Sequence, residues 1–126
     1  MVPLHLLIVD DEPMLLDLLQ QMLAPHTSKT VGTFQEACTL LSTSTESFDV
    51  ILSDLMMPQG SGLDLYHWIA ENKPGLEERL LFLTGGVTQE IHDSIQATDQ
   101  PVLFKPFSVR QLHSAIEGLV SEHLSN

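Results

Sequence analysis

Five polar side chains that directly follow short apolar runs could carry chemistry in this sequence. They are three carboxylates, one hydroxyl and one amine: Asp10, Asp11, Asp54, Thr84 and Lys105. A carboxylate can act as a nucleophile toward a phosphoryl group and become an aspartyl phosphate. We therefore interpret Asp54, which ends the run F-D-V-I-L-S-D, as a reactive carboxylate to which the other groups are delivered.

The charges of these groups indicate what else such a site needs. Three carboxylates a few ångströms apart repel each other by roughly 1 to 4 kcal/mol per pair, so the cluster calls for a cation. Oxygen ligands with open positions suit Mg²⁺. Lys105 can neutralise part of the charge, and the Thr84 hydroxyl and backbone amides beside Gly85 could donate to incoming oxygens. The pattern predicts Mg²⁺-assisted phosphoryl transfer onto Asp54.

The five groups can meet only if the apolar runs before them are neighbouring strands. The run Val50–Leu52 suits a short strand buried on both faces, and Pro58 then closes off regular structure. Similar runs predict strands at residues 4–9, 29–33, 49–54, 79–83 and 101–104. Apolar residues at helical spacing predict a helix after each strand, at residues 13–24, 34–41, 63–71, 87–95 and 109–120.

This alternation predicts an α/β fold with a parallel sheet and helices on both of its faces. The carboxyl ends of parallel strands share one edge of the sheet, so we expect the five polar groups to converge there. Residues 1–126 are predicted to form a single domain. Its core spans about 4–120, and 121–126 are expected to be a frayed tail or the start of a linker.

Several motifs together resemble the receiver domain of response regulators in two-component signalling, the CheY-like domains. They are Asp10-Asp11, Asp54 within D-L-M-M-P, Gly62, Thr84 and Lys105-Pro106-Phe107. The resemblance covers the chain from about Leu4 to Val120. It implies a flavodoxin-like (βα)5 fold with strand order 2-1-3-4-5. It also implies a signalling domain that takes a phosphoryl group from a histidine kinase or a phosphotransfer protein and then switches its binding to a downstream protein or attached domain.

The same resemblance implies roles for individual residues. Asp11, Asp54 and the Met56 backbone carbonyl would ligate Mg²⁺, with Asp10 acting through water. Thr84 would be the switch hydroxyl, Lys105 would pair with the phosphoryl group, and the Lys105–Pro106 bond would be cis. The backbone amides of Leu55 and Gly85 would also contact the phosphoryl group. The stretch L-F-L-T-G-G-V-T most resembles receivers attached to hybrid sensor histidine kinases, whose kinase activity would lie outside this chain.

One departure from the family concerns the switch. Receivers usually carry an aromatic residue three positions before the lysine, and here that position is Val102. Phe104 would share its strand face by the period of two and is the alternative aromatic. Met56 and Gly86 occupy positions that tune the loss of phosphate in the family, and neither offers a polar side chain.

Two other functions remain open from the residues. A degenerate receiver that serves only as a protein-interaction module is favoured by Val102. A phosphohydrolase would also pass through an aspartyl phosphate, but such enzymes usually need a second Asp two residues after the nucleophile, where this chain has Met56.

Composition excludes several classes of partner. The net charge is −12, from 17 acidic and 5 basic residues, and nucleic acid or anionic membrane would need clusters of Lys or Arg. The N-terminus lacks the pattern of a signal peptide, and the apolar runs are too short to span a bilayer. The single cysteine, Cys38, allows no internal disulfide and fits a reduced, cytoplasmic setting.

Overall fold

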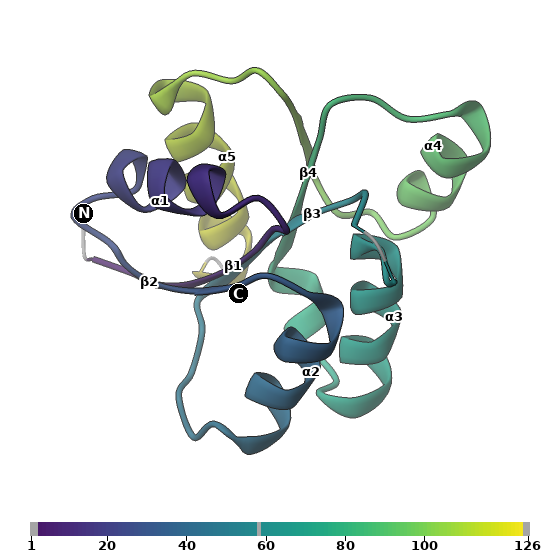
Figure 1. Ribbon diagram of the computed structural model, residues 1–126, viewed down its shortest axis with the longest axis horizontal. Coiled ribbons are helices and arrows are strands. Elements are labelled where there is room, and N and C mark those ends of the chain that lie inside the picture. Colours follow the sequence, from purple (N-terminus) through teal and green to yellow (C-terminus); the bar gives the residue numbers. More distant parts are fainter. Residues whose placement is uncertain (1–2, 58, 125–126) are drawn as a thin grey trace.

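The computed structural model describes residues 3–57 and 59–124. Strands and helices alternate along these residues (Figure 1): β1 (His5–Val9), α1 (Pro13–Met22), β2 (Thr27–Val31), α2 (Phe34–Thr43), β3 (Val50–Asp54), α3 (Gly62–Asn72), the short 3-10 helix η1 (Leu76–Arg79), β4 (Leu80–Thr84), α4 (Gln89–Gln96), β5 (Val102–Phe104) and α5 (Val109–Leu124). Pro58, expected to close off regular structure, and the last two residues of the expected tail lie outside the described residues. Within those ranges, no helix combines the length and the apolar character needed to cross a membrane.

The strands form one parallel sheet in the order β2-β1-β3-β4-β5. This confirms the predicted α/β class and the strand order 2-1-3-4-5. Helices α1 and α5 cover one face of the sheet, and α2, α3 and α4 lie on the other (Figure 1). Cover on both faces explains why the inner strands β3 and β4 are buried along their whole length and are mostly apolar.

Successive residues of each strand point to opposite faces of the sheet, which divides the core into two clusters. On the α1–α5 side, Ile8 and Leu52 pack in a cluster with Leu19 of α1. On the other side, Ile51 and Phe82 pack with residues of α2, α3 and α4. The same alternation decides which face of the sheet each strand-ending polar side chain occupies.

The second strand lies two residues earlier than predicted, at Thr27–Val31 rather than 29–33. Thr33 caps α2 instead, because its side chain accepts a hydrogen bond from the Glu36 N–H at 3.0 Å. β2 is an edge strand with the sequence T-S-K-T-V, so its apolar pattern was too weak to fix its boundaries.

Two further boundaries differ from the prediction. Helix α5 continues through residues 121–124, where a frayed tail or the start of a linker was expected. These four residues contain neither glycine nor proline, and nothing in them stops a helix. Arg79, expected to begin the fourth strand, belongs to η1, and β4 begins at Leu80.

A pair of histidines joins α5 to the amino-terminal edge of the sheet. The buried His26 accepts a hydrogen bond from the Leu4 N–H on Nδ1 at 2.9 Å, and its ring lies 5.7 Å from that of His113. Burial chiefly lowers the pKa of His26; the charge of His113 also lowers it, whereas Glu117 and Asp49 raise it. The folded protein therefore favours the neutral imidazole.

We predict that His26 makes the protein less stable in mild acid. Because its pKa is lower in the folded state than in the unfolded state, the unfolded chain binds more protons as the pH falls below about 6.5. Replacing His26 with Gln keeps a hydrogen-bond acceptor and removes the titrating ring. Between about pH 7 and about pH 5, wild type should lose on the order of 1 kcal/mol more unfolding free energy than His26→Gln, measured by urea denaturation.

The matched control is His67→Gln, at an exposed position of α3, which should keep the pH dependence of wild type. An identical pH dependence in wild type and His26→Gln would contradict the prediction.

Candidate functional site

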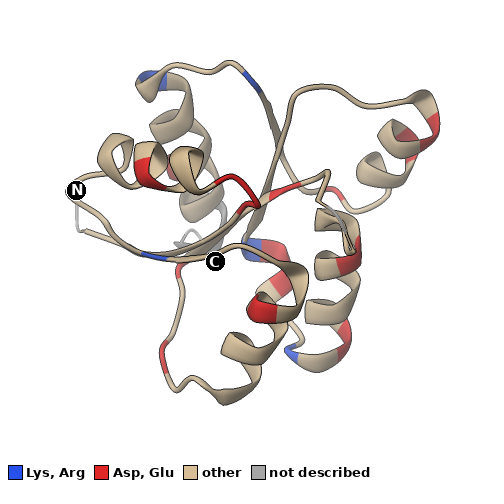
Figure 2. Ribbon diagram, viewed as in Figure 1, with Lys and Arg blue, Asp and Glu red and all other residues tan. Residues whose placement is uncertain are grey.

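The register of the sheet brings two carboxylates together. The pairing of β1 with β3 matches Val9 with Ser53, so Asp10 and Asp54 follow at the ends of adjacent strands and on the same face. Both are buried, with 0% and 6% of their surface exposed. Acidic segments therefore lie side by side at the carboxyl ends of β1 and β3 (Figure 2).

Asp11 and Lys105 complete the cluster. Carboxylate oxygens of Asp10, Asp11 and Asp54 all lie within 4.8 Å of one another, and Asp11 is exposed to solvent. Lys105 follows β5 and places its Nζ 3.4 Å from Asp10 Oδ2 and 3.6 Å from Asp54 Oδ2. The structure thus gathers four of the five polar groups that the sequence singled out.

The cluster carries more negative charge than Lys105 offsets. Burial chiefly raises the pKa of Asp54 above its usual value, and the neighbouring charges of Asp10 and Asp11 raise it further. Lys105 and the Met56 N–H act in the opposite direction without outweighing them. Ionised Asp54 is therefore costly here, and a cation at the cluster would offset the cost. Three carboxylates, one of them open to solvent, are a donor set that fits Mg²⁺.

The backbone amide that faces Asp54 belongs to Met56 and not to Leu55. The Leu55 N–H donates to the Leu83 carbonyl at 2.8 Å, because the pairing of β3 with β4 continues one residue past Asp54. The Met56 N–H donates to Asp54 Oδ1 at 3.2 Å. The Leu55 amide, which the resemblance implies as a phosphoryl contact, is thus engaged in the sheet, and sequence alone gave no sign of where the pairing stops.

Thr84 is fully buried, and its hydroxyl is engaged within its own loop. It donates to the Gly86 carbonyl at 3.0 Å and accepts from the Gly86 N–H at 3.2 Å. Thr84 shares a sheet face with Phe82, whereas Asp54 shares the opposite face with Leu52. The structure places Thr84 on the strand next to Asp54, with its hydrogen bonds directed to the β4–α4 loop.

The two candidate aromatic positions on β5 differ in burial. Val102 pairs with Phe82 and packs against the cluster on the α2–α4 side. Phe104 pairs in register with Thr84 and is 52% exposed. The ring of Phe104, which pairs with Thr84, is therefore about half exposed to solvent. The more buried position, Val102, holds an aliphatic side chain.

Two backbone features shape the loops around Asp54. A side chain at Gly62 would place its Cβ 2.8 Å from the Asp54 carbonyl oxygen, so only glycine lets α3 begin this close to the end of β3. The Lys105–Pro106 peptide bond is cis, in agreement with the expectation, and the Lys105 N–H donates to the Thr84 carbonyl at 2.7 Å. A second cis bond, Ala24–Pro25, was not expected.

Comparison with known proteins identifies the family. The family described as the response regulator receiver domain matches residues 6–117. The chain belongs to this family. As a receiver domain of two-component signalling, it has a signalling role at the level that the whole family shares.

Curated relatives of this receiver domain are longer proteins. The chain is 32% identical over 123 residues to the transcriptional regulatory protein GlrR of Escherichia coli K12, covering 95% of this chain and 27% of that protein. It is 35% identical over 122 residues to the response regulator SaeR of Staphylococcus aureus USA300, covering 93% of this chain and 50% of that protein. This chain therefore spans about a quarter to a half of the relatives it matches.

Solved structures share the fold of this receiver domain. A CheY-like receiver domain protein from Methanospirillum hungatei JF-1 superposes with a TM-score of 0.86 at 23% identity, covering 98% of both chains. The receiver domain of a signal transduction histidine kinase from Syntrophus aciditrophicus gives a TM-score of 0.82 at 25% identity, covering 94% of this chain and 91% of that chain.

We predict that removing the charge of Asp54 stabilises the metal-free protein. The raised pKa means that the folded state binds a proton more tightly than the unfolded state, so stability falls as the pH rises through that range. The cost is therefore larger at pH 7 than in acid. Asp54→Asn should therefore raise the unfolding free energy in EDTA by on the order of 1 kcal/mol.

Asp17→Asn, on the exposed surface of α1, is the control and should leave stability unchanged within error. Equal or lower stability of Asp54→Asn would mean that the attraction to Lys105 outweighs burial and repulsion at Asp54.

Proposed function

We propose that Asp54 accepts a phosphoryl group from the phosphohistidine of a histidine kinase or of a phosphotransfer protein. The observation that carries this proposal is the contact of one lysine with two buried carboxylates, Lys105 with Asp10 and Asp54, at 3.4 and 3.6 Å. Such a cluster costs stability in the absence of ligand, which is typical of a site kept for chemistry.

In the proposed reaction an oxygen of the Asp54 carboxylate attacks phosphorus. The bond between phosphorus and the donor nitrogen breaks, and its electron pair stays on that nitrogen. The Lys105 ammonium neutralises charge on the transferred group, and the N–H groups of Met56 and Gly85 donate hydrogen bonds to its oxygens. The chain acts on its own side chain, both in gaining and in losing the phosphoryl group, and not on a separate substrate.

Mg²⁺ is the cofactor we propose for this step. Asp11, Asp54 and the Met56 carbonyl would hold it directly, and Asp10 would do so through water. When bound, the ion supplies positive charge against the phosphoryl oxygens and the three carboxylates.

The proposed switch runs through Thr84. A phosphoryl group on Asp54 offers its oxygens as stronger acceptors than the Gly86 carbonyl that the Thr84 hydroxyl now binds. Exchange of that hydrogen bond would release the β4–α4 loop and shift α4, which begins just after Thr88. Val102 has no ring to follow this movement, so we place the change in binding surface at this loop and α4.

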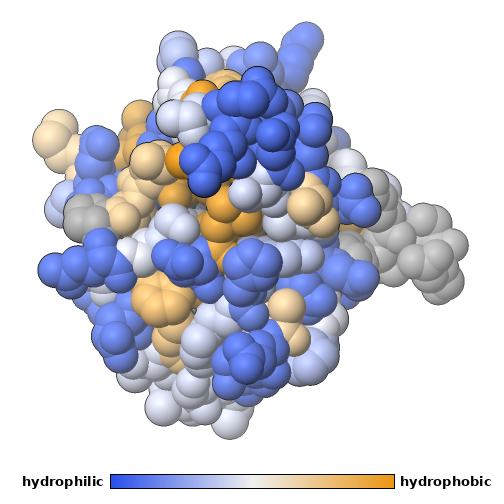
Figure 3. Space-filling model, turned by 90° about the vertical axis from the view of Figure 1, so that its right-hand side faces the viewer, coloured by the Kyte–Doolittle hydropathy of each residue, from blue (hydrophilic) through white to orange (hydrophobic). Residues whose placement is uncertain are grey.

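An apolar groove next to Lys105 is the surface we propose for the phosphodonor. A cavity of about 320 Å³ is lined by Leu15, Leu18 and Met22 of α1 and by Pro106 and Phe107. Apolar side chains exposed beside the reacting group allow a partner to dock and exclude water. By contrast, the face on the α3–α4 side is mostly hydrophilic, with small hydrophobic areas (Figure 3).

The setting that we propose is a cytoplasmic domain of a larger signalling system. Residues 1–126 would form one receiver domain, attached to a hybrid sensor kinase or acting on a separate downstream protein. The net charge of −12 argues against direct contact of this domain with nucleic acid or an anionic membrane.

We predict that the chain gains one phosphoryl group from acetyl phosphate, and only when Mg²⁺ is present. Intact mass spectrometry should show a single adduct on wild type and on Asp17→Asn, and none on Asp54→Asn, because the nucleophilic carboxylate is missing. Omitting Mg²⁺ or adding EDTA should abolish the adduct.

Two outcomes would contradict the proposal. Failure of wild type to gain an adduct in Mg²⁺ would favour a pseudo-receiver that acts only as an interaction module. Sustained turnover of a phosphomonoester such as p-nitrophenyl phosphate would favour a phosphohydrolase.

A further inference from the structure

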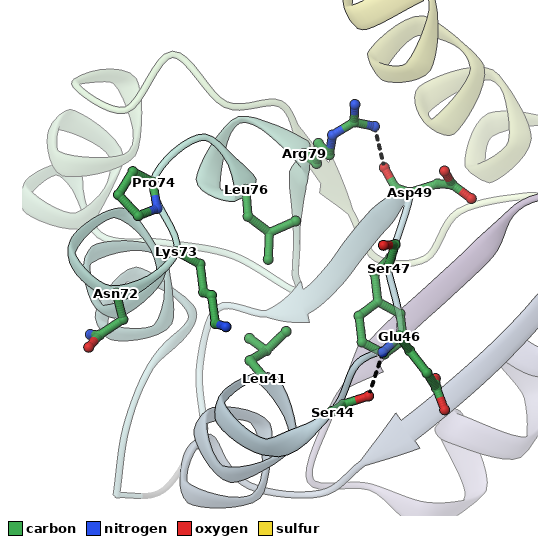
Figure 4. Close-up of a pocket in the computed structure, with 11 residues that line it drawn as sticks. Leu41, Ser44, Glu46, Ser47, Asp49, Asn72, Lys73, Pro74, Leu76 and Arg79 are labelled. Carbon is green, nitrogen blue, oxygen red and sulfur yellow. Dashed lines mark hydrogen bonds between the residues drawn. The ribbon is translucent and has the colours of Figure 1, made fainter.

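A cavity lies at the edge of the sheet opposite to Asp54. It has a volume of about 580 Å³ and lies between the carboxyl ends of α2 and α3 (Figure 4). Asp49 and Arg79, which immediately precede β3 and β4, mark its position at the amino-terminal edge. Because β3 is five residues long, this edge is roughly 16 Å from Asp54.

The floor of the cavity is apolar. Leu41 of α2 and Phe48 of the loop before β3 are 5% and 6% exposed, and Leu76 of η1 lies beside them. Ser44, Ser47 and Asn72 add polar groups at the rim. The volume of the cavity falls in the range of sites that hold small molecules.

The two acids that line the cavity are directed away from it and already have partners. Figure 4 shows the carboxylates of Glu46 and Asp49 pointing out of the cavity. Glu46 contacts Lys29 at 3.2 Å and His5 at 2.8 Å, which lowers its pKa. Asp49 accepts a hydrogen bond from the His5 N–H at 2.8 Å on Oδ2. Neither carboxylate is therefore aimed at a ligand in the cavity.

The two cations of the lining are differently placed. Lys73, just after α3, directs its side chain into the cavity toward Leu41 and Leu76 (Figure 4). Among the described residues it forms no ion pair within 4.0 Å. Arg79 donates one hydrogen bond to the Asp49 carbonyl at 3.2 Å, and a guanidinium has further N–H groups to offer. Because the two lining acids point outward, Lys73 is the residue that brings a positive charge into the cavity (Figure 4).

We propose that this cavity binds a small organic acid. Its apolar body would lie on Leu41, Phe48 and Leu76, and its carboxylate would accept a hydrogen bond from the Lys73 ammonium. The ligand would replace water around an unpaired ammonium with a charge-assisted hydrogen bond. This inference goes beyond the phosphoacceptor function, because it uses none of the residues around Asp54.

The test is a titration of the ¹⁵N-labelled, unphosphorylated chain with phenylacetate, followed by NMR. Phenylacetamide, which has the same ring without the charge, is the matched ligand. Phenylacetate should cause saturable shifts of the amides at residues 44–49 and 72–79, and phenylacetamide should bind about tenfold more weakly. Lys73→Met keeps the length of the side chain and should weaken phenylacetate binding by about tenfold. Arg110→Met, an exposed cation of α5, should bind like wild type.

Three outcomes would overturn the proposal. One is the absence of saturable shifts in wild type. Another is that phenylacetate and phenylacetamide bind equally well and that Lys73→Met weakens neither. The cavity would then bind the apolar ring without recognising the carboxylate. The third is shifts centred on Lys105 and residues 54–56. Repeating the titration on Asp54→Asn separates this inference from the phosphoacceptor proposal, because binding should be unchanged there.

Discussion

The fold holds the carboxylates of Asp10 and Asp54 side by side and out of water. Burial and mutual repulsion both work against this arrangement, and the raised pKa of Asp54 records the net cost. Lys105 offsets part of it from the neighbouring β5–α5 loop. The energy that holds the carboxylates in place comes from the apolar residues of the inner strands and the helices that cover them on both faces.

Because successive side chains of a strand point to opposite faces, the polar groups at the carboxyl edge are distributed over both faces of the sheet. Asp10, Asp54 and Lys105 gather on the α1–α5 side, whereas Thr84 belongs to the face covered by α2, α3 and α4. The hydrogen bonds of Thr84 with Gly86 tie it to the loop before α4.

Sequence reasoning predicted the alternating elements and the meeting of Asp10, Asp11, Asp54 and Lys105 because both follow from local patterns. Buried strands are apolar runs, and parallel strands end at one edge. Three features depend on strand pairing and tertiary packing, which local sequence patterns do not predict. They are the boundaries of the polar edge strand β2, the use of the Leu55 amide in the sheet, and the bonds of Thr84 to Gly86. The cavity beside Lys73 also depends on tertiary packing, since its lining comes from two stretches of the chain, residues 41–49 and 72–79.

We propose that Asp54, rather than its neighbours Asp10 and Asp11, carries the phosphoryl group. Reduction of the phosphorylated chain with sodium borohydride converts an aspartyl phosphate to homoserine, which peptide mapping by tandem mass spectrometry can locate. The account predicts homoserine at position 54 and at no other position. Homoserine at position 10 or 11, with Asp54 unchanged, would contradict it and would make Asp54 a supporting carboxylate.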